Sequence, residues 1–219
     1  MQNGLLYGVG NRGGVYTIQT PPATTDVVVS KVSQLSVTLS GSNFGVDFNP
    51  AADRLRIISD NGQNLAHNLA NSTTTVNTTL TTDGATTHGV SAAAYTNNDL
   101  NATTGTTLVD INTTSDQVVI QSPPANGLLV ANGSLGVNAV NAGFDIYSDL
   151  VGGKTDSVTG FATLLSSSNT ATFYTVNLFT GAANGVGQFP IPLGPVPRTG
   201  NAATLLDRGR VDSRPGPRW

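Results

Sequence analysis

Four charged residues around one expected turn are the first candidates for a site with chemistry. Asp47 lies in a short alternating run, Asp53 and Arg54 end the turn at 49–53, and Arg56 follows two residues later. One interpretation is a binding site at the end of a strand. In the other, the carboxylates cap turn amides and pair with arginine beneath a loop, a geometry that charge-assisted hydrogen bonds favour. Asx residues make such turns readily, so we expect the second arrangement.

The sequence shows no recognisable catalytic apparatus. His67 and His88 are the only histidines, and neither lies in a ligand spacing such as H-E-x-x-H, so we expect surface or packing roles for both. There is no G-x-S-x-G motif and no phosphate-binding loop. The Asp residues lie mostly in turns rich in Asn and Gly, and no pair is evidently placed across a cleft for glycoside hydrolysis. We therefore expect no catalytic residues, no cofactor and no enzyme activity.

A calcium ion in a loop is an open alternative. Hard oxygen ligands occur in the loops at 60–62, 97–99 and 145–149. The twelve-residue EF-hand pattern is missing because the chain contains no Glu. Glycosylation is a second alternative, since N-x-S/T sequons occur at Asn71, Asn77, Asn101, Asn112 and Asn132.

The composition favours strands over helices. All 13 acidic residues are Asp, Lys31 and Lys154 are the two lysines, and Thr and Asn are abundant. Strong helix formers are therefore scarce. The net charge of −3 gives no support for binding nucleic acid or a membrane surface. No apolar run approaches the roughly 20 residues that span a bilayer.

The absence of cysteine excludes a disulfide framework and a thiolate zinc site. A Cys-free, Lys-poor chain rich in Thr and Asn is typical of bacterial surface and extracellular proteins, so we expect an extracellular or cell-surface location. Met1–Gly4 shows no signal-peptide pattern, and a trimmed chain would also lack one.

Short alternating runs separated by turns recur along the chain, as in a sandwich, barrel or propeller. Equivalent first strands are about 45–55 residues apart, the length of one four-stranded propeller blade. We therefore predict an all-β, propeller-like array of about four four-stranded antiparallel blades over residues 1–189. The expected strands are 5–8, 14–19, 26–31, 43–48, 54–59, 63–69, 90–95, 106–111, 117–121, 128–132, 142–148, 159–165, 172–178 and 183–189.

The first blade is one strand short. No run comparable to 43–48 precedes 5–8, so a blade that begins at residue 1 lacks its innermost strand. Proteins normally close an unpaired edge in so buried a layer. We therefore expect another segment to fill this position.

Residues 190–219 form a second unit, an extended tail rich in Pro and Arg. Four prolines between 190 and 197 mark a stiff connector, and half of the ten basic residues follow it. The run 202–206 can form a strand. We expect the tail to dock on its own or a neighbouring subunit through Ala202, Thr204, Leu205, Leu206, Arg208, Arg210 and Trp219.

Several motifs in order resemble a bacterial family of unknown function, the domain of unknown function family 4394. They are Gly45–Pro50, Asp53–Ser59, Gly62–Asn64, Ala94–Asn98, Thr106–Ile111, Gln121–Pro124, Leu135–Val137 and Gly143–Ile146. The resemblance covers residues 4–188 and implies a secreted or surface-associated, propeller-like protein with no established activity. Members generally have further strands upstream of Leu5–Ile18, and the tail after Phe189 matches nothing in the family. Both departures argue against the usual intramolecular closure of the propeller.

Three functions remain open. We expect a structural subunit of an extracellular filament or other homopolymer, joined by strand or tail exchange, because a missing inner strand and a strand-capable tail complement each other. The alternative is a monomeric binding module, such as an adhesin or a glycan-binding propeller, whose tail closes its own first blade. The third is a hydrolase with Asp residues on the axis, which would need converging titratable groups.

Overall fold

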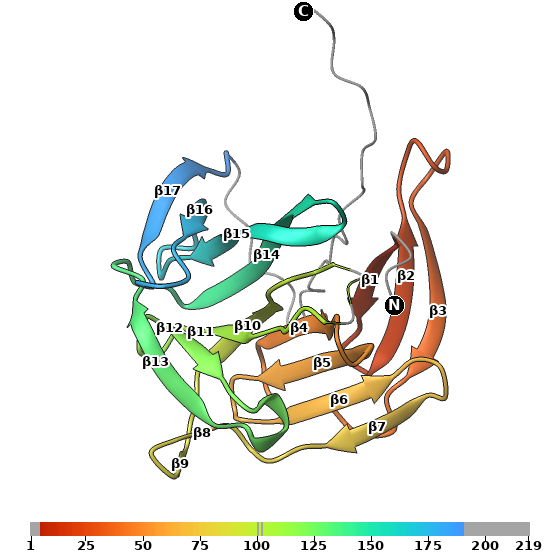
Figure 1. Cartoon of the computed structure of the whole chain (residues 1–219), viewed down its shortest axis with the longest axis horizontal. Helices are drawn as coiled ribbons and strands as arrows, with labels where there is room; N and C mark the ends of the chain where they lie inside the picture. Colours follow the sequence, from red (N-terminus) through yellow and green to blue (C-terminus); the bar gives the residue numbers. More distant parts are fainter. Residues whose placement is uncertain (1–4, 100, 102, 191–219) are drawn as a thin grey trace, which may run out of the picture.

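The computed structural model describes residues 5–99, 101 and 103–190 and is built from strands and turns, with a single 3-10 turn at Pro124–Asn126. The strands form four antiparallel sheets that we call blades 1 to 4, plus a small hairpin. Figure 1 shows the blades placed side by side around a common centre. This confirms the predicted all-β, propeller-like array of four blades. None of the described segments is a helix long and apolar enough to cross a membrane.

Each blade is a simple meander in which consecutive strands are neighbours. Blade 1 contains β1 (Leu6–Val9), β2 (Gly14–Gln19) and β3 (Val28–Gln34), and blade 2 contains β4 (Phe44–Asn49), β5 (Arg54–Ser59), β6 (Asn64–Asn68) and β7 (Thr73–Val76). Blade 3 contains β10 (Val90–Tyr95), β11 (Leu108–Asn112), β12 (Gln117–Gln121) and β13 (Leu129–Ser134). Blade 4 contains β14 (Asn141–Val151), β15 (Lys154–Leu165), β16 (Ala171–Val176) and β17 (Ala183–Gln188), and the hairpin contains β8 (Thr81–Thr82) and β9 (Ala85–Thr86).

The sequence locates most of these strands closely. The bounds of β2, β5, β10 and β12 are as predicted, because alternation and flanking turns are clear there. The prediction missed β7, since the run Thr73–Val76 has no alternation of apolar and polar residues. It also placed β3 two residues too early and too short. Apart from Pro190, the predicted tail unit lies outside the described residues, with all seven residues proposed for assembly.

The innermost strands of blades 2, 3 and 4 form a central layer. β10 lies against β4 on one side and β14 on the other, and no comparable contact joins β1 to β4. The two strands approach closely at Gly45, where a Cβ atom would lie 2.6 Å from the backbone nitrogen of Ala93. Glycine therefore permits the close packing of blades 2 and 3.

A buried leucine marks the same position in three blades. Leu35, Leu80 and Leu135 each follow the outermost strand of a blade. The Leu80 and Leu135 N–H groups donate to the turn between the second and third strands of their blades, at the carbonyls of Gly62 and Asp116, with N···O distances of 3.0 and 2.8 Å. The Leu35 N–H group makes the same contact at 2.8 Å with the carbonyl of Gly13. Because Gly13 lies between β1 and β2, β1 corresponds to the second strands β5 and β11. Blade 1 therefore has no innermost strand among the described residues, as the sequence predicts.

Three apolar clusters hold the four blades together, one at each successive boundary. Each strand places alternate residues on opposite faces of its sheet. In blades 2 and 3, one face therefore packs against the preceding blade and the other packs against the following blade. Among the described residues no core cluster and no extensive strand contact joins blade 4 to blade 1. The array is therefore open between its first and last blades in the part of the chain that the structure describes.

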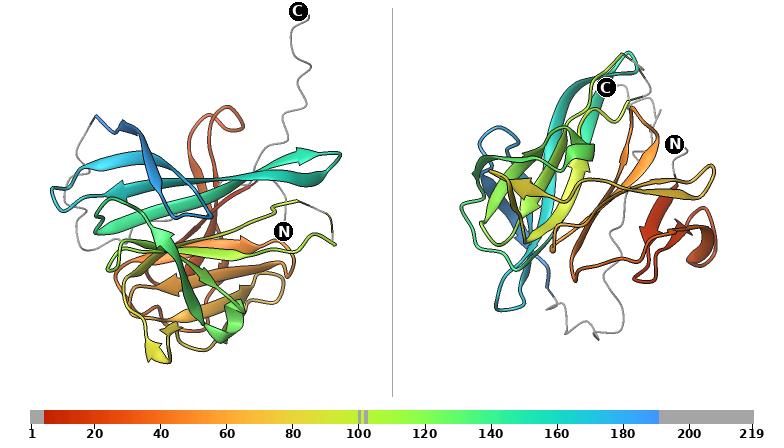
Figure 2. Two further views of the ribbon diagram at one scale, coloured as in Figure 1. Left: turned by 60° about the vertical axis from the view of Figure 1, so that its left-hand side comes forward. Right: turned by 90° about the horizontal axis from the view of Figure 1, so that it is seen from below.

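The hairpin of β14 and β15 extends beyond the rest of blade 4, as the left panel of Figure 2 shows. The two strands pair out to Val151 and Lys154, whereas β16 joins β15 only from Gly160. We call residues 147–158 the arm. The loop that follows β10 braces the arm through Asp99, whose Oδ2 accepts hydrogen bonds from the backbone N and Oγ1 of Thr155, both at 2.8 Å.

Candidate functional site

The charged residues singled out in the sequence separate into an internal pair and an exposed pair. Asp47 on β4 and Arg56 on β5 are directly opposite each other in the sheet and face blade 3. Asp53 and Arg54 are exposed at the intervening turn. There the Arg54 guanidinium donates to the carbonyls of Ala52 and Asp53, at 3.1 and 3.0 Å. The Asn49 Oδ1 caps the turn by accepting from the N–H groups of Ala51 and Ala52, at 2.9 and 3.0 Å, so an amide oxygen has the capping role that we expected of the carboxylates.

Arg56 is the centre of a polar network between blades 2 and 3. Its Nε donates to the Tyr95 hydroxyl at 3.2 Å, and its Nη1 donates to the amide oxygens of Asn64 and Asn77 at 2.7 and 2.6 Å. Asn64 in turn donates to the carbonyl of Pro124 in blade 3 at 2.9 Å. The network therefore ties the two blades together through hydrogen bonds as well as apolar contacts.

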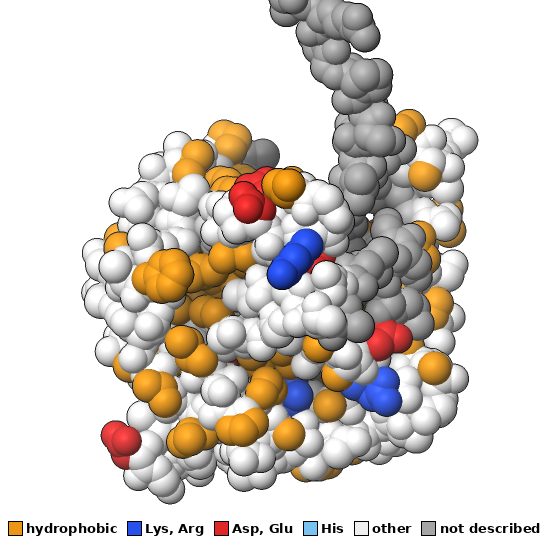
Figure 3. Space-filling model, viewed as in Figure 1, with side chains coloured by type: hydrophobic (Ala, Val, Ile, Leu, Met, Phe, Trp, Pro, Cys, Tyr) orange, Lys and Arg blue, Asp and Glu red, His pale blue; other side chains and the backbone are white. Residues whose placement is uncertain are grey.

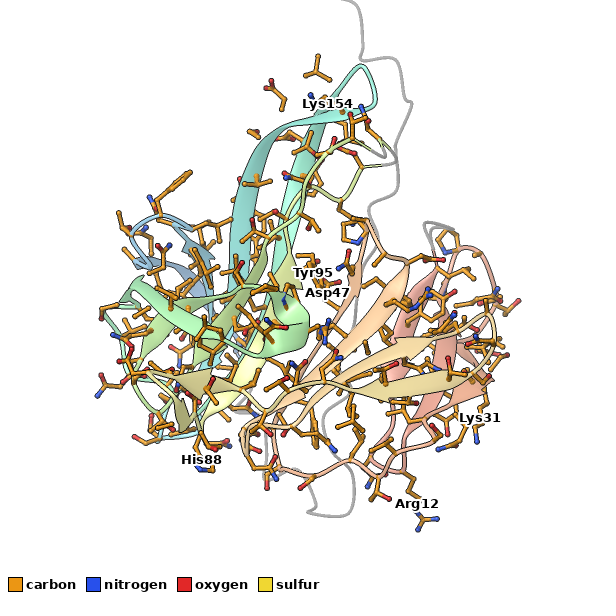
Figure 4. The ribbon with its side chains drawn as sticks, turned by 60° about the horizontal axis from the view of Figure 1, so that its bottom comes forward. Arg12, Lys31, Asp47, His88, Tyr95 and Lys154 are labelled. Atoms are coloured by element: carbon orange, nitrogen blue, oxygen red, sulfur yellow. The ribbon has the colours of Figure 1, made fainter. Side chains whose placement is uncertain are left out.

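Asp47 links the same two blades through the backbone. Its Oδ2 accepts a hydrogen bond from the N–H of Tyr95 at 2.6 Å, and its Oδ1 accepts one from Phe48 at 2.6 Å. Figure 4 shows Asp47 and Tyr95 next to each other at the centre of the molecule, whereas Arg12, Lys31, His88 and Lys154 lie at the periphery. Burial raises the pKa of the Tyr95 hydroxyl, and the neighbouring Arg56 charge opposes that shift.

Asp110 is the most unusual group in this boundary, and no sequence motif pointed to it. It lies on β11 between Val109 and Ile111, which face blade 4, so its side chain faces blade 2, and it is completely buried. Neither carboxyl oxygen has a hydrogen-bond partner among the described residues. An ionised carboxylate in such surroundings is very costly. Burial accordingly raises the pKa of Asp110 well above its usual range, and the Arg56 charge opposes this only in part.

Gln121 provides a complementary group. Its Nε2 donates to the Pro124 carbonyl at 2.6 Å, but its buried Oε1 has no donor among the described residues. In the β11–β12 register Asp110 is opposite Val119 and Leu108 is opposite Gln121, so Asp110 and Gln121 are diagonal neighbours on one face. A protonated Asp110 would carry an O–H donor of the kind that the Gln121 Oε1 lacks. We therefore interpret Asp110 as a neutral carboxylic acid.

His67 is a buried packing residue, as the sequence suggested. Its Nε2 lies 2.8 Å from the Ser33 Oγ, and its Nδ1 lies 3.0 Å from the Thr74 Oγ1. A serine within reach of a histidine resembles a nucleophile with its base. Here the third member is a hydroxyl in place of a carboxylate, and burial lowers the pKa of the imidazole. The cluster instead joins β3 of blade 1 to β6 and β7 of blade 2.

Two of the segments considered for calcium, 60–62 and 97–99, are loops whose carboxylates accept backbone hydrogen bonds, whereas 145–149 lies within strand β14 and is not a loop. Asp60 accepts hydrogen bonds from the N–H groups of Ser42 and Asn43 at 2.9 and 3.0 Å, and Asp99 accepts from Thr155 and Asn101. No group of three or more His, Cys, Asp or Glu side chains is arranged to hold a metal within residues 5–99, 101 and 103–190. A loop calcium stays an untested alternative.

The five sequons fall into two groups. Asn71 and Asn101 are exposed, and each Oδ1 accepts hydrogen bonds from the backbone N and Oγ1 of the sequon threonine. The other three asparagines use their side chains internally: Asn77 binds Arg56, Asn112 caps its turn and Asn132 donates to the Leu178 carbonyl. Glycosylation of a folded chain would therefore be confined to Asn71 and Asn101.

The two ends of the blade array carry apolar faces that no described blade covers. The end face of blade 1 comprises Leu6, Tyr16, Ile18, Val29 and Lys31, which point away from the cluster shared with blade 2. Val29 is 58% exposed. The opposite face of blade 1, by contrast, is packed in the apolar cluster shared with blade 2.

The end face of blade 4 comprises Asp145, Tyr147, Asp149, Phe161 and Phe173, on the side opposite the cluster shared with blade 3. The Phe161 and Phe173 rings are stacked, with centroids 5.7 Å apart and planes at 2°. Tyr147 is 53% exposed. Each end of the array therefore presents apolar side chains in the position where a further blade would pack.

The comparison with known families agrees with the motifs that the sequence carries. No curated protein matches the chain significantly. The family model for the domain of unknown function DUF4394 matches residues 1–195, which include all four blades. The match extends past Phe189, so the expectation that nothing after this residue resembles the family is wrong for residues 190–195. The protein therefore belongs to the DUF4394 family.

Proposed function

We propose that this protein is a structural subunit of an extracellular assembly. In this assembly the C-terminal segment of one copy supplies the innermost strand of blade 1 in the next copy. The observation that supports the proposal is the position of β1. The leucine landmarks make β1 equivalent to second strands, while blades 2, 3 and 4 each contribute an innermost strand to the central layer.

The C-terminal segment has the reach and the sequence for this role. The chain is still part of blade 4 at Phe189, whose N–H donates to the Ala171 carbonyl at 3.0 Å. Residues 190–201 then separate blade 4 from the strand-capable run 202–206. At about 3 Å per residue an extended connector of this length crosses roughly 35 Å. That distance is comparable to the width of a domain of about 190 residues.

Such an exchange produces an open polymer. The donor segment leaves blade 4 and the acceptor position is on blade 1, so the contact joins two different surfaces. Heterologous contacts of this kind form filaments unless the rotation between copies closes a ring. Strand addition also satisfies the backbone groups of both partners. The Cys-free, Thr- and Asn-rich composition fits an extracellular or cell-surface location.

Deletion of residues 191–219 tests the proposal. We expect the full chain to form assemblies visible by electron microscopy and light scattering, and the truncated chain to remain monomeric with its far-ultraviolet circular dichroism retained. Assemblies that persist after the deletion would overturn the proposal. A full chain that is monomeric at all concentrations and loses stability on truncation would instead identify a monomeric binding module whose tail completes its own blade.

A further inference from the structure

We infer that the end face of blade 4 in one copy packs on the end face of blade 1 in the next copy. This inference rests on the proposed assembly and names the surface through which the subunits meet. It identifies the partner as a second copy of this chain. The tail exchange and the face contact are separate interactions and can be tested separately.

The molecule already uses this kind of face-to-face packing between its own blades. Successive blades pack face to face at three boundaries, each with its own apolar cluster. Four blades have eight faces, and these boundaries use six of them. The two that remain are the end face of blade 4, on the side of a following blade, and the end face of blade 1, on the side of a preceding blade. Every internal boundary joins two faces of these same two kinds. A second copy can therefore repeat the same packing at the ends.

The two end faces carry side chains that complement each other. Aromatic rings on blade 4 and aliphatic side chains with Tyr16 on blade 1 form a combination that buries well and adds aromatic contacts. The blade 4 face carries Asp145 and Asp149, whereas the blade 1 face carries Lys31. The two surfaces thus have opposite charges at their margins, which favours contact between different ends over contact between like ends.

The direction in which the chain leaves blade 4 fits the same contact. The described chain leaves blade 4 through its outermost strand β17. When blade 4 of one copy lies on blade 1 of the next, residues that follow Phe189 start beside the blade that lacks an innermost strand. The face contact therefore raises the effective concentration of the tail at its acceptor, as a second linked interaction does.

The charge distribution of the sequence supports the same arrangement. Residues 191–219 contain five Arg and two Asp, a net charge of +3, whereas residues 1–190 contain eleven Asp and five Lys or Arg, a net charge of −6. Figure 3 shows how few charged side chains interrupt the hydrophobic and uncharged polar surface on one side of the molecule. A basic segment is therefore attracted to the body of a neighbouring copy.

The test uses two full-length variants that each block one face. Tyr147→Glu places a charge on the blade 4 face, and Val29→Glu places one on the blade 1 face. Both side chains are more than half exposed, so neither change should unfold the chain. Phe179→Glu and Val76→Glu are matched controls, since these residues are 86% and 65% exposed and lie on neither end face.

Analytical ultracentrifugation of single variants and their mixture gives the result. We expect each end-face variant to raise the concentration needed for assembly at least tenfold, and the controls to assemble as the unmodified chain does. An equimolar mixture of Tyr147→Glu and Val29→Glu should form a heterodimer and nothing larger, because one unblocked pair of faces remains. The heterodimer also demonstrates that both variants are folded.

Three results would overturn the inference. The end-face variants could assemble like the controls, their mixture could stay monomeric, or the unmodified chain could be monomeric throughout. The full-length variant Leu205→Pro separates the two proposals, because proline cannot join a central strand. If Leu205→Pro abolishes assembly while the end-face variants do not, the face contact is wrong and the tail exchange stands. The reverse pattern refutes the exchange alone.

Discussion

The boundary between blades 2 and 3 buries polar and charged side chains, whereas the two end faces of the array expose apolar ones. The boundary encloses charged and polar side chains, including Arg56 and Asp110, and hydrogen bonds or a proton compensate for their burial. The end faces carry apolar side chains such as Tyr147 and Val29 that stay exposed. Stability therefore resides in the internal boundaries, while the surfaces suited to association are at the ends. Substitutions in the two regions should have different effects.

The largest difference is expected between an internal leucine and an end-face aromatic residue. Leu135→Ala removes a buried side chain that contacts the cluster between blades 3 and 4. Such changes lower the free energy of unfolding by about 2–5 kcal/mol. Tyr147→Ala should change it by less than about 0.5 kcal/mol, because the ring is largely exposed. Chemical denaturation of both variants below the assembly concentration measures the contrast, and equal losses would contradict it.

Asp110→Asn tests whether the boundary contains a neutral carboxylic acid. The raised pKa of Asp110 means that the folded state holds a proton that the unfolded chain releases near pH 4. Its contribution is complete below that pH and is lost as the pH rises through the folded-state pKa. Asparagine keeps the shape and, like a protonated carboxyl group, carries a donor, but it does not titrate. We expect the free energy of unfolding at pH 7 to be unchanged or higher by about 1–2 kcal/mol. The loss of stability that Asp110 causes as the pH rises should be absent from the variant.

The control for that experiment is the sign of the change at neutral pH. If Asp110 were ionised and paired with Arg56, its replacement would leave an uncompensated buried arginine. Removing one partner of a buried pair costs about 3–5 kcal/mol. A loss of that size in denaturation at pH 7 would show that our interpretation of Asp110 is wrong.

Asp99→Asn should show the opposite dependence on pH. Burial tends to raise the pKa of this carboxyl group, but hydrogen bonds from Thr155 and Asn101 outweigh it and the net shift is downward. The contribution of Asp99 is therefore present above the unfolded pKa near 4 and lost as the pH falls through the lower folded-state value. We expect the variant to lose about 1 kcal/mol at neutral pH. Hydrogen exchange at the Thr155 amide in the arm is the measurement, and unchanged protection would contradict the prediction.

The sequence predicted the blades because turn residues and alternation are local signals. It predicted a three-stranded first blade for the same reason, since residues 5–31 contain three strand signals. The polar boundary was only half foreseen: Asp47 and Arg56 stand near a conspicuous turn, whereas Tyr95, Asp110 and Gln121 belong to blade 3 and carry no motif. Their proximity depends on how β5 and β11 occupy equivalent positions in adjacent blades. That relation appears only when the blades are packed together.

The end faces were also not predicted, because a strand with alternating residues indicates two faces without showing which one is covered. Val29 and Tyr147 look like ordinary strand residues in the sequence. Their exposure follows from the open ends of the array, which is a property of the whole arrangement. The same openness is the reason to expect self-association.

In the proposed assembly, a tail strand from one copy completes blade 1 of another. Because the chain has no cysteine, single cysteines can report that contact directly. One variant carries Leu6→Cys on β1, and its partners carry Ala202→Cys, Thr204→Cys or Leu206→Cys. Disulfides form only where Cα atoms approach within about 7 Å. Mixing the single variants under oxidising conditions should yield a cross-linked pair between chains with at least one partner. Absence of that pair, together with an intramolecular disulfide when both cysteines are in one chain, would contradict the account.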